Sequence, residues 1–202
     1  ALNIEFSYES QLKYSEILYR LKRTKDAEQI IDGILKNNLN SNEIKFLNAI
    51  KLRFNGEVKK AVELLLSVKE NIKDNPSILD SKLQINYNFL LAKFQNDAGD
   101  LQGAIATYEK LLETHPGDLS TLNELAVAYV EKNYRLDYAL DLIERALKYQ
   151  PFNSYFLDTQ GMIFLKIGKN QEALAKFEES LKLNPNCEDT QKHLSELVES
   201  KT

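Results

Sequence analysis

The sequence has no tryptophan, one cysteine (Cys187), one methionine (Met162) and two histidines among its 202 residues. A single cysteine cannot form an internal disulfide, so packing alone must hold the fold together. No apolar run approaches the ~20 residues that a helix needs to cross a bilayer, so direct membrane insertion is not expected. The 26 Lys and Arg residues against 30 Asp and Glu give a net charge of −4, without the basic excess typical of nucleic-acid binders.

Proline is also scarce, but its four residues are regularly placed along the chain. Pro76, Pro116, Pro151 and Pro185 are separated by 40, 35 and 34 residues. Two further series of small residues run in step with the prolines: Ala27, Ala61, Ala104, Ala139 and Ala173, and Ser15, Ala49, Ala92, Ala126 and Gly161. Three series in one phase predict five repeats.

Each repeat has the pattern of two amphipathic helices joined by a turn. Apolar residues recur at helical spacing from Leu122 to Lys132, and a second run of this kind extends from Ala139 to Leu147. Pro151 ends the second helix, because proline lacks the N–H that continues the helical hydrogen bonds. No stretch shows the sustained alternation of a strand, so a sheet is not expected.

A glycine stands five residues before the alanine in three of the repeats, at Gly56, Gly99 and Gly168. Lys22 takes this place in the first repeat, and Asn133, one residue further back, takes it in the fourth. These residues mark the turn between the two helices of each repeat.

This combination of a period near 34 residues, small residues, a turn glycine and a terminal proline resembles the tetratricopeptide repeat. The best match is the last repeat, Leu157-x3-Gly161-x2-Phe164-x3-Gly168-x4-Ala173-x3-Phe177-x7-Pro185. The resemblance implies an all-α fold, a right-handed α-solenoid of antiparallel helix pairs, as a single domain over residues 1–202. The expected repeats cover about 8–41, 42–76, 77–116, 117–151 and 152–185, followed by a capping helix at 187–200.

Two departures from a uniform repeat carry further expectations. The 43-residue step from Ala61 to Ala104 predicts lengthened helices, one from Ala61 to about Lys73 and one from Ser77 to about Asn96. The C-terminal segment places Leu194, Leu197 and Val198 on one stripe. Such a stripe suits a helix that covers the last apolar face, as solenoids require.

The resemblance implies that the first helices line a concave groove that binds a peptide or a protein segment. Several candidate groove residues are polar or aromatic, and asparagine can both donate to and accept from an extended backbone. Ordinary solvated helix residues are the alternative explanation for each position. The candidates are Phe46, Ile50, Arg53, Asn86, Phe89, Lys93, Asn96, Asn123, Val127, Tyr155, Asp158 and Met162.

More specific chemistry finds little support in the sequence. Cochaperones of this family hold a carboxylate tail with a basic clamp of Lys, Arg and Asn residues. The clamp is missing from this chain whether it is aligned from the second repeat or from the third. His115 and His193 are expected at the surface in different repeats, without catalytic or metal-ligand spacing. No cofactor or metal is therefore expected. The basic run Lys22-Arg23-Thr24-Lys25 is expected to be solvated, although it could steer an acidic partner.

We therefore expect a non-catalytic scaffold for protein–protein interaction, with a partner that the sequence does not identify. A self-associating assembly subunit and the regulatory domain of a larger enzyme are the alternatives. The chain starts at Ala1 without an initiating methionine, so we expect it to belong to a longer or processed protein. No signal peptide is visible at this start. The compartment is left open between the cytoplasm, which is slightly favoured, and an exported or periplasmic location.

Overall fold

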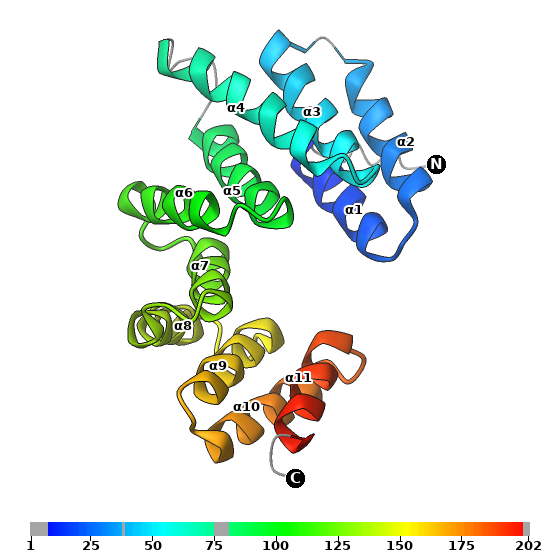
Figure 1. Ribbon diagram of the computed structural model, residues 1–202. Coiled ribbons are helices and arrows are strands. Elements are labelled where there is room, and N and C mark those ends of the chain that lie inside the picture. Colours follow the sequence, from blue (N-terminus) through cyan, green and yellow to red (C-terminus); the bar gives the residue numbers. More distant parts are fainter. Residues whose placement is uncertain (1–7, 38, 75–80, 200–202) are drawn as a thin grey trace. The chain divides into compact units, whose positions relative to one another are not determined.

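The computed structural model describes residues 8–37, 39–74 and 81–199, and these residues form eleven α-helices and no strand (Figure 1). The predicted all-α class is therefore confirmed. By its internal contacts the chain divides into two compact units, Ala1–Asp100 (unit 1) and Leu101–Thr202 (unit 2), which are described separately below. A single domain over residues 1–202 stays a prediction.

In each unit, helices that follow one another in the chain pack against one another. Within unit 1, α1 pairs with α2 and α3 with α4, while α2 also packs on α3 and α4 on α5. Within unit 2, α7 pairs with α8 and α9 with α10, and the first helices α7 and α9 are also in contact. Unit 1 contains α1 (Tyr8–Arg20), α2 (Thr24–Leu35), α3 (Ser41–Phe54), α4 (Val58–Asp74) and α5 (Ser81–Asp97). Unit 2 contains α6 (Leu101–Thr114), α7 (Leu119–Glu131), α8 (Leu136–Tyr149), α9 (Ser154–Lys166), α10 (Asn170–Leu183) and α11 (Glu188–Glu199).

The expected lengthening of two helices is confirmed. Both α4 and α5 have 17 residues, whereas the other helices have 12 to 14. The predicted start of the second long helix at Ser77 lies outside the described residues, as does Pro76.

The small residues of the two series lie where helices cross most closely. All five alanines of the second-helix series are 0 % exposed, and so are Ala49, Ala92 and Ala126 of the first-helix series. Side chains of this size let helix axes approach within about 8–10 Å. At Gly161 of α9 the approach leaves no room for a side chain, because a Cβ atom added there would lie 2.5 Å from Cε1 of Phe177 on α10.

The first helix of every repeat ends in the same backbone motif. Gly56, Gly99 and Gly168 have φ values of 79°, 85° and 80°, in the left-handed region that glycine adopts without a steric penalty. Lys22 and Asn133 adopt the same region, with φ of 59° and 51°. The turn positions expected from the sequence are thus the left-handed residues of five helix ends.

Two backbone hydrogen bonds close each of these helix ends. In the first repeat the N–H of Lys22 donates to the Tyr19 carbonyl at 2.9 Å, and the N–H of Arg23 donates to the Leu18 carbonyl at 2.9 Å. This pair of bonds is the Schellman motif, which satisfies carbonyl groups that a helix end would otherwise leave open.

The C-terminal helix α11 packs on α10 and closes the core of the last repeat. Leu197 is 0 % exposed and lies with Ala173 and Phe177, and Leu194 packs against the same cluster. The prediction was wrong for Val198, which is 54 % exposed. It follows Leu197 directly, and adjacent helical residues point about 100° apart.

We predict that Gly161→Ala lowers the free energy of unfolding by about 1–3 kcal/mol, because Phe177 must move to admit the methyl group. Gly33→Ala is the matched control, since no atom lies within 4 Å of the added Cβ in α2. The control should raise the stability by about 0.5–1 kcal/mol. Urea unfolding monitored by circular dichroism measures both, and equal effects of the two substitutions would contradict the close crossing.

We also predict that Lys22→Gly raises the free energy of unfolding by roughly 0.5–1 kcal/mol, because it removes a side chain from a left-handed position. The reciprocal change Gly56→Lys should lower it by a similar amount. Thermal melts of the two variants provide the comparison, and a lower melting temperature for Lys22→Gly would argue against this assignment of the turn.

Candidate protein-binding surface

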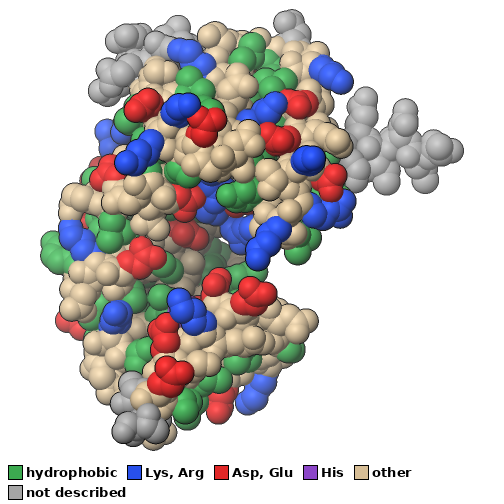
Figure 2. Space-filling model, turned by 45° about the vertical axis from the view of Figure 1, so that its right-hand side comes forward, with side chains coloured by type: hydrophobic (Ala, Val, Ile, Leu, Met, Phe, Trp, Pro, Cys, Tyr) green, Lys and Arg blue, Asp and Glu red, His purple; other side chains and the backbone are tan. Residues whose placement is uncertain are grey.

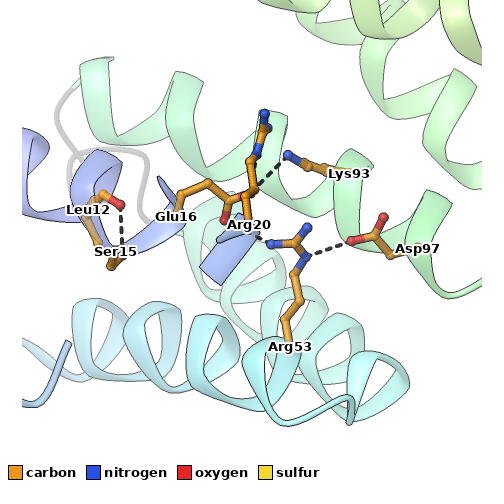
Figure 3. Close-up of polar contacts among 7 residues, drawn as sticks. All are labelled: Leu12, Ser15, Glu16, Arg20, Arg53, Lys93 and Asp97. Atoms are coloured by element: carbon orange, nitrogen blue, oxygen red, sulfur yellow. Dashed lines mark hydrogen bonds and ion pairs between the residues drawn. The ribbon is translucent and has the colours of Figure 1, made fainter. Parts of the chain in front are cut away.

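Charged side chains link three first helices of unit 1 (Figure 3). Arg53 of α3 donates from Nη1 to Oε2 of Glu16 on α1 at 2.9 Å, and from Nε to Oδ2 of Asp97 on α5 at 2.7 Å. Lys93 of α5 donates from Nζ to Oε1 of the same glutamate at 3.2 Å. Arg20 of α1 also lies 3.4 Å from Oε1 of this glutamate, so three cations and two carboxylates form one network.

Arg53 is the centre of this network and is 7 % exposed. Its guanidinium group lies over the rings of Tyr19 and Phe94, at 5.0 and 5.2 Å from their centroids. Burial by itself lowers the pKa of Arg53, but Glu16 and Asp97 outweigh it and raise the pKa above its ordinary value. Burial likewise raises the pKa of Glu16, and Lys93 and Arg53 reverse this, so that the pKa of the carboxyl group is lowered.

These pairings change the interpretation of two candidate groove residues. Arg53 and Lys93 are held by carboxylates of the chain itself, so they do not form an open basic clamp. Sequence reasoning missed the partners Glu16 and Asp97. A signal was present for one of them, because Glu16 follows Ser15 and Lys93 follows Ala92, the same position in two repeats. Opposite charges at equivalent positions of stacked first helices indicate a pair.

Two other candidates in unit 1 belong to the core. Phe46 and Ile50 of α3 are 3 % and 6 % exposed and lie in the hydrophobic cluster of this unit. The ring of Phe46 lies 6.4 Å from that of Tyr87 on α5. Phe46 and Ile50 therefore support the first helices from within the core, and their expected role as contact residues is corrected.

The remaining candidates of unit 1 all lie on α5. Asn86 is exposed, while Phe89 and Asn96 are half-buried. They therefore extend the first-helix surface along α5 beyond the charged network.

In unit 2 a hydrogen bond links the candidate residue Asn123 of α7 to helix α9. Thr159 of α9 donates from Oγ1 to Oδ1 of Asn123 on α7 at 2.9 Å. Tyr155, one turn before Thr159, is 54 % exposed, and Val127 and Met162 are half-buried. The half-buried Asn123 and the exposed Tyr155 thus lie on two successive first helices, and Thr159, which is 2 % exposed, links these helices from within.

The last candidate, Asp158, lies beneath the C-terminal helix. It is 8 % exposed, and its two carboxylate oxygens lie 3.1 and 3.2 Å from Nδ1 of His193 on α11. The ring of His193 also lies 5.8 Å from that of Phe177. Two expectations are corrected here: Asp158 is not open to a ligand, and His193 is not a solvated surface residue. The sequence missed the pair because its members lie 35 residues apart.

The hydrogen bond with Asp158 raises the pKa of His193, although burial opposes the charged form. The contact between His193 and Asp158, which holds the C-terminal helix, therefore depends on the protonation of His193.

Basic and acidic side chains lie interspersed over the face shown in Figure 2. Within residues 8–37, 39–74 and 81–199, no group of three or more His, Cys, Asp or Glu side chains is placed to hold a metal ion. None of the described helices is both long and apolar enough to cross a membrane.

Residues 47–202 match the family model described as the tetratricopeptide repeat-like domain. The chain belongs to this family. Each unit is accordingly an α-solenoid of antiparallel tetratricopeptide helix pairs. No curated protein shows significant sequence similarity to the chain.

Solved structures of tetratricopeptide proteins share the fold. TTC0263 from Thermus thermophilus superimposes with a TM-score of 0.68 at 18% identity, covering 94% of this chain and 98% of that chain. MamA from Desulfovibrio magneticus RS-1 gives 0.65 at 13% identity, over 82% of this chain and 88% of the other. YrrB, a tetratricopeptide protein with an unusual peptide-binding site, gives 0.61 at 11% identity, over 94% and 92%.

We predict that the C-terminal helix is held more tightly at pH 6 than at pH 8. The pKa of His193 is higher in the folded chain than in the unfolded chain. The stabilisation from its pairing with Asp158 is therefore complete below the unfolded pKa of about 6.5, and it is lost as the pH rises through the folded pKa. The expected difference is about 0.5–1 kcal/mol. Hydrogen exchange of α11 amides, corrected for the intrinsic pH dependence of exchange, measures it.

The variant His193→Gln should remove this pH dependence, and His115→Gln is the control, because that histidine lies in the α6–α7 loop. If His193→Gln leaves the pH dependence intact, the ion pair with Asp158 does not hold the helix.

Proposed function

We propose that the chain is a non-catalytic scaffold that binds an extended peptide or protein segment on the surface formed by its first helices. The observation that carries the proposal is the pair of first helices α7 and α9, where buried Thr159 holds the half-buried Asn123 and Tyr155, one turn before Thr159, is exposed. We call Asn123 and Tyr155 the α7–α9 surface. The unusual peptide-binding site of YrrB supports peptide binding within this fold.

The chemistry of the α7–α9 surface suits an extended backbone. The Thr159 hydroxyl contacts both the amide of Asn123 and the backbone carbonyl of Tyr155, which positions the amide, and an amide offers both N–H donors and an oxygen acceptor to an extended backbone. Tyr155 adds a large ring with a hydroxyl group, the kind of side chain that dominates binding energy at interfaces. A bound segment would therefore gain its register from the amide and much of its affinity from the ring.

The charged network of unit 1 contributes little attraction for an acidic ligand. Each of its cations already contacts a carboxylate of the chain, so a peptide carboxylate would have to displace Glu16 or Asp97. We therefore expect binding to depend only weakly on salt, because few unpaired charges would be screened. Asn86, Phe89 and Asn96 of α5 are proposed as a separate contact region within unit 1.

The test is a screen of the intact chain against a peptide array, followed by affinity measurements with the best peptide. We predict that Tyr155→Ala and Asn123→Ala each weaken binding by about 1–3 kcal/mol, the range typical of interface anchors. Tyr149→Ala is the matched control, since Tyr149 lies at the end of the second helix α8 and is 73 % exposed. Fluorescence anisotropy measures the affinities, and circular dichroism checks the fold.

Loss of affinity in Tyr149→Ala together with full binding by the Tyr155→Ala variant would move the site to the second helices. Strong weakening by salt would instead point to a charged contact that this proposal does not include.

A further inference from the structure

The first helix α1 has a second apolar face that the core does not use. Tyr14 and Ile17 of α1 and Leu21, the residue that follows it, recur at helical spacing and are 50 %, 53 % and 64 % exposed. Leu18, on another side of the same helix, is 3 % exposed and belongs to the core of unit 1. We call Tyr14, Ile17 and Leu21 the α1 face.

The corresponding face of α3 shows what such a surface contacts. Ser15 of α1 and Ala49 of α3 occupy the same position in two repeats. With these two residues aligned, the equivalents of Ile17 and Leu21 are Lys51 and Asn55. Lys51 forms an ion pair with Asp32 of α2 at 2.5 Å, and Asn55 donates to Glu28 of α2 at 2.9 Å. In α3, this face therefore packs on the second helix of the preceding repeat.

The same relation holds in α7 of unit 2. The equivalents of Tyr14 and Ile17 are Leu125 and Ala128, which are each 1 % exposed. The equivalent of Leu21 is Lys132, which donates a hydrogen bond to Gln102 of α6. In α7 too, the face lies against a preceding second helix.

The two helices in each such contact run antiparallel. Asn55 at the end of α3 meets Glu28 near the start of α2, and Lys132 at the end of α7 meets Gln102 near the start of α6. A helix packed in this way on α1 would bring its N-terminal turn to the end of α1.

Positive charge is concentrated at that end. Lys22, Arg23 and Lys25 form the turn after α1, and within it Arg23 pairs with Asp26 at 2.6 Å. The acidic residues Glu28 and Asp32 of α2 are turned toward α3. A helix N-terminus carries partial positive charge, so a partner needs Asp or Glu in its first turn to meet this turn favourably.

We propose that the α1 face binds an amphipathic helix of a partner protein, antiparallel to α1, with an apolar stripe and an acidic first turn. The interaction buries Tyr14, Ile17 and Leu21 as a second helix buries Leu125 and Ala128. This helix-binding site on the α1 face is separate from the α7–α9 surface, which is proposed to bind an extended segment.

The probe is a fluorescein-labelled peptide with the sequence of α10, Asn170–Leu183. This second helix has Glu172 in its first turn and an apolar stripe that includes Ala173 and Phe177. Fluorescence anisotropy with the intact chain should show binding. The double variant Ile17→Ser, Leu21→Ser should weaken it at least tenfold. The peptide carrying Glu172→Lys should bind severalfold more weakly.

The matched control is Tyr149→Ser, Phe152→Ser, which removes two apolar side chains that are 73 % and 80 % exposed in unit 2. It should bind the probe as the unchanged chain does. All four positions are exposed, so circular dichroism should show the same helix content in every variant.

The proposal is overturned if the probe does not bind, or if it binds both double variants equally. Sedimentation velocity of the unchanged chain decides between partners. Self-association that Ile17→Ser, Leu21→Ser abolishes would assign the α1 face to a second copy and also overturn the proposal. Peptide binding through Tyr155 and Asn123 is measured separately, so failure of either proposal leaves the other distinguishable.

Discussion

The close crossing of neighbouring helices at small side chains is the constraint on which the rest of this structure depends. The alanines of the second helices are 0 % exposed, and Gly161 lies so near Phe177 that even a methyl group would collide with the ring. Larger residues at these points would separate the helices and open cavities between repeats. With the crossing points fixed, every other position of a repeat acquires a defined direction, toward the core, the next repeat or the first-helix surface.

The two units use this surface differently. In unit 1 its centre is a charge network around Arg53, which is nearly removed from water and therefore needs both carboxylates. In unit 2 the bond between Asn123 and Thr159 links the first helices without net charge. Removing one partner of the network would leave a charge poorly compensated, whereas neutral side chains can exchange water for a ligand at lower cost. This difference is why the α7–α9 surface is the better candidate for binding.

The first and the last of the described helices differ as well. A stack of repeats leaves an apolar surface at each end, and a cap with a polar outer side keeps such a surface from associating. The C-terminal helix α11 buries Leu197, pairs His193 with Asp158 and turns mostly polar residues outward. Helix α1 instead exposes Tyr14, Ile17 and Leu21 on the side that packs on a preceding helix in α3 and α7. Of these two helices, α11 therefore covers an apolar core with a polar outer side, whereas α1 carries an exposed apolar face.

The sequence by itself determined the helix pairs, the buried alanines, the two long helices and the five turns, including the left-handed Lys22 and Asn133. These features are local or repeat at a fixed period, so spacing along the chain reveals them. Only the tertiary structure decided that Arg53 and Lys93 are paired, that Asp158 lies beneath α11, that Phe46 and Ile50 are buried and that one face of α1 is exposed. The ion-pair partners lie 35 to 77 residues apart. Periodicity shows which side of a helix is apolar, but packing between helices determines which side chains meet.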